Sequence, residues 1–142
     1  MVYVRVSFRP GCPEIGDRNQ TFARFAQAGT LVEGESTRVH PAVAPQPGEV
    51  VVTKRRVSAF AGSDLDVVLR AGGTDALVLT GISTSGVVLS TLRQAADLDF
   101  SLTVLSDACA DPDAEVHRVL CEKVFPHQAQ VLTVADWIAG LG

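Results

Sequence analysis

Hydrophobic residues recur along the chain with two different periods, and the period changes several times. Short alternating or continuous apolar runs predict five β-strands, at residues 2–6, 49–53, 76–80, 102–105 and 131–133. Apolar positions spaced three to four residues apart predict helices at 21–28, 63–70, 85–97, from 112 onward and after 133. Because strands and helices alternate, we expect one α/β domain over residues 1–142, a three-layer fold with a mostly parallel sheet flanked by helices.

One predicted strand differs from the others in its pattern. The run Ala76–Thr80 is apolar at nearly every position instead of alternating. This pattern is typical of a strand that is buried on both faces of a parallel sheet. The next helix is expected to follow from about Ser85, and a later one to begin at Asp111 and Pro112, with Pro126 beyond its end.

Composition and net charge exclude some of the functional classes to which this chain could belong. Of 142 residues, 46% are hydrophobic and 20% are charged, which is enough apolar material for a real core. The formal net charge of −4 argues against a general nucleic-acid binder, which usually carries a basic surplus. The one dense basic cluster, Lys54-Arg55-Arg56, is short enough to be a solvated strand end.

The sequence predicts no membrane segment and no disulfide framework. Its longest uncharged stretch, Ala76–Leu92, has a polar, glycine-containing centre and is shorter than a bilayer span. The first residues do not have the pattern of a signal peptide. Three cysteines without CxxC spacing argue against a zinc site and are best explained by a reducing cytoplasm.

The most informative local feature is the segment Gly81–Gly86, which lies between a predicted strand and a predicted helix. Two glycines bracket four residues there, and backbone N–H groups in such a loop can hold an anion. The segment matches neither G-x-G-x-x-G nor G-x-S-x-G, and it has no Walker lysine. A tight turn with a serine cap is the simpler interpretation and remains open.

Three segments together have a specific pattern. They are Val52–Phe60 followed by Leu65 and Leu69, then Leu77–Thr91 with Ala95, and then Val104–Ala110 with His117. In this order and spacing the chain resembles the isochorismatase-like cysteine hydrolases over nearly its whole length. The resemblance implies a parallel sheet flanked by helices and the hydrolysis of small amides, other C–N bonds or vinyl ethers by an Asp-Lys-Cys triad.

The resemblance also implies roles for individual residues. Lys54 falls on the family lysine. The oxyanion would be held by the loop residues Ile82, Ser83, Thr84, Ser85 and Gly86, with a cis peptide bond between Ile82 and Ser83. Phe60 matches a position that tends to line the pocket, although an aromatic residue of the core is equally consistent with the sequence. No cofactor and no metal ion are implied.

Two members of the triad have no counterpart in this sequence. The family pattern Thr-Asp-Val-Cys-Val places its cysteine on Val87, and valine has no nucleophilic atom. No Asp-x-Gln strand occurs, and the chain begins on what resembles the family's second strand. Because that first strand would be central, we expect a gap in the sheet or a different pairing. An open apolar edge would favour further chain upstream or a partner chain that closes the sheet.

Other groups could replace the lost nucleophile. Ser83 or Ser85 could attack, but no adjacent base is visible in the sequence. Cys109 follows a neighbouring strand and could face the same cleft, although a small buried cysteine is the commoner case. A cluster of three acidic residues and one histidine could form a metal site. Acidic residues in the first turn of a helix also interact favourably with the helix dipole, which is the alternative explanation. The cluster comprises Asp111, Asp113, Glu115 and His117.

The sequence therefore supports two hypotheses of different class. In the first, the chain is a family hydrolase whose catalytic groups have been replaced. In the second, it is a non-catalytic module that keeps the fold for binding a small anion or for assembly. Both hypotheses place a small polar or anionic molecule against Lys54 and the Ser83–Gly86 amides, and both expect a homo-oligomer that binds neither nucleic acid nor a membrane.

Overall fold

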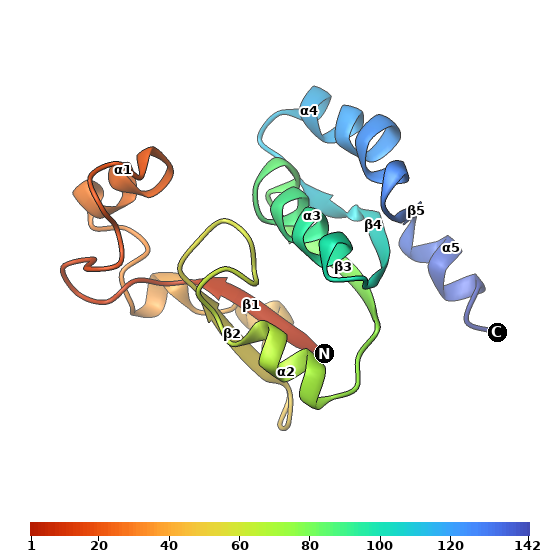
Figure 1. The fold of residues 1–142 in the computed structure, drawn as a ribbon, viewed down its shortest axis with the longest axis horizontal. Coiled ribbons are helices and arrows are strands. Elements are labelled where there is room, and N and C mark those ends of the chain that lie inside the picture. Colours follow the sequence, from red (N-terminus) through yellow and green to blue (C-terminus); the bar gives the residue numbers. More distant parts are fainter. The chain divides into compact units, whose positions relative to one another are not determined.

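The computed structural model describes residues 1–142 and divides them into two compact units. The first unit comprises Met1–Arg56 with Ala61–Asp64, and the second comprises Val57–Phe60 with Leu65–Gly142. The α/β class is confirmed, because parallel sheets are flanked by helices (Figure 1). The single domain over residues 1–142 stays a prediction.

The first unit is built on two parallel strands, β1 (Val2–Val6) and β2 (Val50–Lys54). A long connection between them contains the helix α1 (Gln20–Ala28), shown in orange in Figure 1. Asn19 caps this helix by accepting a hydrogen bond from Phe22 N–H, and Gly29 ends it in the left-handed conformation. Two short 3-10 turns, Glu35–Thr37 and Pro41–Val43, complete the connection.

The second unit contains a three-stranded parallel sheet in the order β3-β4-β5. Its helices are α2 (Leu65–Ala71), α3 (Leu89–Asp97), α4 (Ala114–Val119) and α5 (Val134–Ala139). The strands are β3 (Ala76–Ile82), β4 (Ser101–Ala110) and β5 (Gln130–Leu132). Both α3 and α5 contact β4, the central strand. Leu92, Val104 and Phe125 are fully buried and form the centre of this core.

The strand β3 is less buried than the sequence predicts. The prediction of a strand covered on both faces was wrong, because no residue of β3 is fully buried and Val78 is 42% exposed. The cause lies in the topology, in which β3 pairs with β4 on one side and no strand pairs with its other edge. The five strands accordingly form one sheet of two strands and one of three, which agrees with the expected gap.

Several boundaries also differ from the prediction. The strand β4 runs on to Ala110, so Cys109 belongs to a strand rather than to a loop. This extension pairs with the end of β3 after a shift of register between Leu79 and Gly81. The predicted helix at 85–97 begins with a π-helical turn, Thr84–Val88, before α3.

The start of α4 was also predicted two residues too early. Asp113, not Asp111, caps this helix, and its side chain accepts hydrogen bonds from the N–H groups of Glu115 and Val116. Pro126 lies beyond the end of α4, as predicted, inside the 3-10 turn Phe125–His127. None of the helices is both long enough and apolar enough to cross a membrane.

Candidate functional site

The segment between β3 and α3 is a tight turn built around one buried threonine. The peptide bond between Ile82 and Ser83 is cis, as the family resemblance implies. Thr84 follows and is fully buried, and its Oγ1 lies 2.8 Å from Nδ1 of His117 on α4. A hydrogen bond between these two side chains therefore fixes the turn against α4.

Two N–H groups of this turn, those of Ser85 and Gly86, already have partners within the protein. Ser85 N–H donates to Oδ2 of Asp111 at 2.7 Å, and Gly86 N–H donates to the carbonyl oxygen of Ser83 at 3.2 Å. Hydrogen bonds from the side chain and the backbone N–H of Ser85 lower the pKa of the Asp111 carboxyl. The turn thus holds a carboxylate of its own, and an anion binding at Ser85 N–H would have to displace it.

Gly86 stands where the family pattern has a valine, and its environment explains part of this difference. A Cβ atom built on Gly86 would lie 2.6 Å from Oγ of Ser83, closer than two such atoms approach in proteins. The Ser83 hydroxyl therefore lies where a larger residue at 86 would extend. A side chain at Gly86 would require Ser83 to change its rotamer.

Val87, which the family resemblance places on the position of the cysteine, is half-buried within this turn. Cys109 lies on β4 next to the end of β3. Its register partner there is Gly81, and its Sγ lies 4.0 Å from the carbonyl oxygen of Leu79. Burial raises the pKa of Cys109 to about 11, so its thiol is protonated at neutral pH. This is the chemistry of a packed cysteine rather than an activated one.

Cys121 lies in the same region and was not considered as a site residue from the sequence. Its Sγ is 3.8 Å from Nε2 of His117, while Nδ1 of that ring faces Thr84. Burial raises the pKa of the Cys121 thiol, so the neighbouring imidazole does not produce a thiolate there. Neither thiol of the second unit therefore supplies an activated nucleophile.

Lys54 ends β2 in the first unit, where its side chain is buried. Its Nζ donates to the carbonyl oxygen of Arg56 at 2.7 Å, and no carboxylate pairs with it. Burial lowers the pKa of Lys54 to about 8, so a substantial neutral fraction exists just above neutral pH. The turn belongs to the second unit, and a pocket shared by Lys54 and the turn remains a prediction.

The remaining predicted residues fall in structural positions. Phe60 is buried and stacks obliquely on Phe100, with ring centroids 6.0 Å apart, which favours its interpretation as a core aromatic. Three of the four residues of the possible metal group have separate structural roles. Asp111 binds the turn, Asp113 caps α4 and His117 contacts Thr84, and no three His, Cys, Asp or Glu side chains are placed to hold a metal ion.

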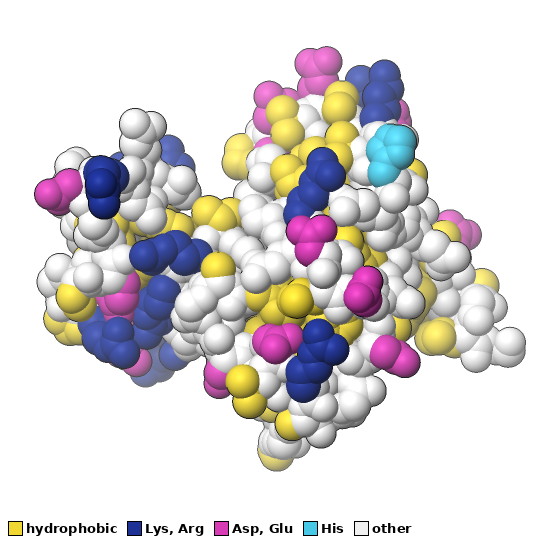
Figure 2. Space-filling model, viewed as in Figure 1, with side chains coloured by type: hydrophobic (Ala, Val, Ile, Leu, Met, Phe, Trp, Pro, Cys, Tyr) yellow, Lys and Arg dark blue, Asp and Glu magenta, His cyan; other side chains and the backbone are white.

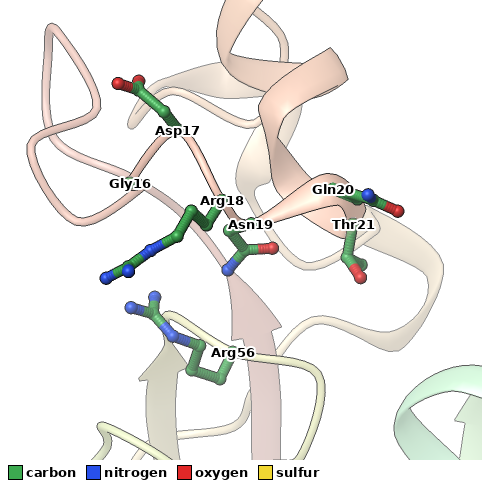
Figure 3. Close-up of a pocket in the computed structure, with 7 residues that line it drawn as sticks. All are labelled: Gly16, Asp17, Arg18, Asn19, Gln20, Thr21 and Arg56. Carbon is green, nitrogen blue, oxygen red and sulfur yellow. The ribbon is translucent and has the colours of Figure 1, made fainter.

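Two residues that matter to the turn were missed as its partners. Asp111 and His117 stand 26 and 33 residues from the groups they contact, so nothing local to the turn reveals them. The only sequence signal was that His117 belongs to the third segment of the family resemblance. The structure also has a hollow that the sequence did not predict, lined by residues before α1 and by Arg56 (Figure 3).

Comparisons with known proteins give the context for this site. A model of the isochorismatase domain matches residues 1–136. The uncharacterized isochorismatase family protein YwoC of Bacillus subtilis is 36% identical over 137 residues, which cover 96% of this chain and 71% of that protein. The ureidoacrylate amidohydrolase RutB of Variovorax paradoxus is 52% identical over 95 residues, covering 66% of this chain and 38% of that protein.

Solved structures agree with these sequence relatives. An isochorismatase family protein from Burkholderia thailandensis superposes with a TM-score of 0.86 at 33% identity, covering 95% of this chain and 70% of the other. The chain spans about half the length of the curated relatives it matches, from 34% to 71% in eight of them. The match of the domain model to nearly the whole chain shows that it belongs to the isochorismatase family.

Proposed function

We propose that this chain binds a small carboxylate- or amide-bearing molecule at the turn between β3 and α3 and does not perform thiol hydrolysis. This proposal rests on Val87, which the family resemblance places on the position of the family cysteine. Loss of the nucleophile costs on the order of a million-fold in rate in an enzyme whose groups act as a unit. The chain belongs to a hydrolase family, but in this chain the residue at the nucleophile position has no atom that could attack the substrate.

The nearby thiols do not replace the missing sulfur. Cys109 and Cys121 are both buried, and burial raises the pKa of each. A protonated thiol is a poor nucleophile, and no lysine or arginine is among the groups that shift the pKa of either thiol. The hydroxyl of Ser85 hydrogen-bonds the Asp111 carboxylate, but the lowered pKa of that carboxyl makes it a weak base. The imidazole of His117 contacts Thr84 rather than Ser83 or Ser85.

The turn nevertheless has the chemistry to hold a carboxylate. It holds that of Asp111 through Ser85 N–H at 2.7 Å. A ligand carboxylate or amide oxygen would take the same hydrogen bond after Asp111 moves aside. Binding at this turn is therefore a competition between the ligand and an internal carboxylate.

A titration with acetate tests the binding step. We expect acetate to shift the amide NMR signals of Ser83–Gly86, and we expect Asp111→Ala to tighten binding by about tenfold because the internal competitor is gone. Asp97→Ala is the matched control, because Asp97 is an exposed acid at the end of α3. Equal affinities for the wild type, Asp111→Ala and Asp97→Ala would contradict binding at this turn.

Labelling with iodoacetamide tests the position of the missing nucleophile. Val87→Cys should be alkylated at least about tenfold faster than the buried cysteines of the wild type, because the introduced thiol lies in the turn. Val116→Cys, on an exposed face of α4, gives the rate of an ordinary surface thiol. A thiol at position 87 that reacts no faster than the buried cysteines would refute this placement.

A hydrolase with replaced groups is the second candidate. It is favoured by the similarity to RutB, which is described as a ureidoacrylate amidohydrolase, and by a lysine whose pKa is about 8. A panel of small amides and ureido acids separates the two candidates. Turnover by the wild type that falls at least about tenfold in Lys54→Ala would support the hydrolase and contradict the binding-only proposal.

A further inference from the structure

A hollow of about 730 Å³ lies in the first unit beside the start of α1. Its lining comprises Gly16, Asp17, Arg18, Asn19, Gln20, Thr21 and Arg56. Small-molecule sites in proteins typically occupy about 300–1,000 Å³, so the hollow has room for more than a bare ion. None of these residues belongs to the turn between β3 and α3.

The two arginines give this hollow its electrostatic character. Figure 3 shows the guanidinium groups of Arg18 and Arg56 facing one another, while the carboxylate of Asp17 points away from them. Neither arginine takes part in any of the five ion pairs of the chain. Two cations that face each other without a carboxylate repel, and an anion between them would remove that repulsion.

The guanidinium of Arg56 is nevertheless held in place. One of its nitrogens donates to the carbonyl oxygen of Arg55 at 2.7 Å, and another donates to the carbonyl oxygen of Glu14 at 3.0 Å. These carbonyls are neutral, so they orient the group without cancelling its charge. Positioning by the backbone reduces the entropy that a ligand would otherwise have to remove on binding.

The carboxylate of Glu14 is already paired, and that of Asp17, which also lines the hollow, points away from the two arginines. Oε1 of Glu14 pairs with both Arg9, at 2.7 Å, and Arg55, at 3.2 Å. Arg55 also donates to the carbonyl oxygen of Ser7. One carboxylate thus serves two arginines, and the charges of Arg18 and Arg56 remain uncompensated.

We propose that this hollow binds a small molecule through a phosphate group held between Arg18 and Arg56. Guanidinium groups match phosphate oxygens with paired hydrogen bonds, and two of them balance its double negative charge. The nine-residue helix α1 begins at the hollow, so its positive end adds to the attraction. Asn19, Gln20 and Thr21 offer polar side chains to the remainder of the ligand.

Titration of the full chain with inorganic phosphate tests this proposal, with the amide NMR signals of Gln20 and Thr21 as the readout. We expect saturable shifts there, and we expect Arg18→Gln and Arg56→Gln each to weaken the affinity at least about tenfold. Arg38→Gln is the matched control, because this exposed arginine of the same unit does not line the hollow. It should change the affinity less than about twofold.

Two further measurements separate a built site from general attraction. Arg18→Lys and Arg56→Lys keep the charge but lose the paired hydrogen bonds, so each should weaken binding by less than the glutamine variants but by more than Arg38→Gln. Signals of Ser85 and Gly86 report binding at the turn and distinguish the two sites. The circular dichroism spectrum of each variant shows whether it is folded like the wild type. Among folded variants, equal weakening by Arg18→Gln, Arg56→Gln and Arg38→Gln, or the absence of saturation, would overturn the proposal.

Discussion

The two units of this chain use their charged residues in different ways. The first unit carries eight basic and six acidic residues, whereas the second carries four basic and ten acidic residues. In the second unit acids bind backbone N–H groups: Asp113 caps α4, Asp107 binds Val134 N–H at 2.8 Å and Asp111 binds the turn. These acids have structural roles in capping helices and turns.

The first unit has the opposite arrangement. Its arginines outnumber the carboxylates that contact them, and two of them face a hollow without an ion pair. Figure 2 shows basic side chains gathered on the first unit. The formal net charge of −4 therefore conceals a basic surplus in the first unit and an acidic surplus in the second.

The largest expected effect tests whether the two units unfold independently of each other. Phe125→Ala removes a fully buried ring from the second unit and should lower its free energy of unfolding by about 3–5 kcal/mol. Hydrogen exchange should then speed up in β3 and β4 and leave β1 and β2 nearly unchanged. Phe8→Ala, fully buried in the first unit, is the reciprocal control. Equal acceleration in all four strands would mean that the units unfold as one.

The next effect concerns the buried lysine of the first unit. Its pKa is lowered from 10.5 to about 8, so the unfolded chain binds more protons than the folded chain between these values. The stability therefore rises with pH across that window, and below it the buried charge costs the folded state about 3 kcal/mol. A variant without the amine avoids this cost but also loses the hydrogen bond to Arg56, which reduces its gain in stability by about 1 kcal/mol.

Urea unfolding measures this contribution directly. Lys54→Met should be about 2 kcal/mol more stable than the wild type at pH 7, and the difference should shrink as the pH approaches 10.5. Lys123→Met is the matched control, because Lys123 is the other lysine of the chain and is exposed. A stability difference for Lys54→Met that does not depend on pH would contradict burial of a titrating amine.

The smallest effect tests the capping carboxylate at the turn. The pKa of Asp111 is lowered in the folded state, so its stabilisation is present above the unfolded pKa and is lost as the pH falls through the folded value. Solvent screens this group, and Asp111→Asn should cost at most about 1 kcal/mol at pH 7. Thermal unfolding at pH 7 and pH 3 should show a smaller cost at the lower pH, which lies below the ordinary pKa of 3.8. The same cost at both values would mean that charge is not what the turn requires.

Much of the secondary structure followed from local patterns. Strands β1, β2 and β5 and the helix α1 lie within one or two residues of their predicted bounds, because period, caps and glycines act over a few residues. The cap of α5 was predicted as well: Thr133 accepts a hydrogen bond from Asp136 N–H. The cis bond before Ser83 came from the family resemblance rather than from local chemistry.

The errors share a different cause. The burial of β3 depends on how many neighbours the strand has, and its own apolar sequence does not specify that number. Cys109 was placed in a loop because the extension of β4 is stabilised by pairing with β3 after a register shift. The start of α4 was misplaced because Asp111 binds Ser85 N–H across 26 residues and leaves the cap to Asp113.

The sequence by itself determined the α/β alternation and the family, because these depend on residue types and their spacing. Through the family resemblance it also predicts a valine at the position of the nucleophile. Only the tertiary structure decided that the turn already holds the Asp111 carboxylate, that the thiols are protonated by burial and that two arginines face one hollow. Hydrogen bonding, desolvation and facing charges depend on atoms that lie far apart along the chain, and folding brings them within a few ångströms of one another.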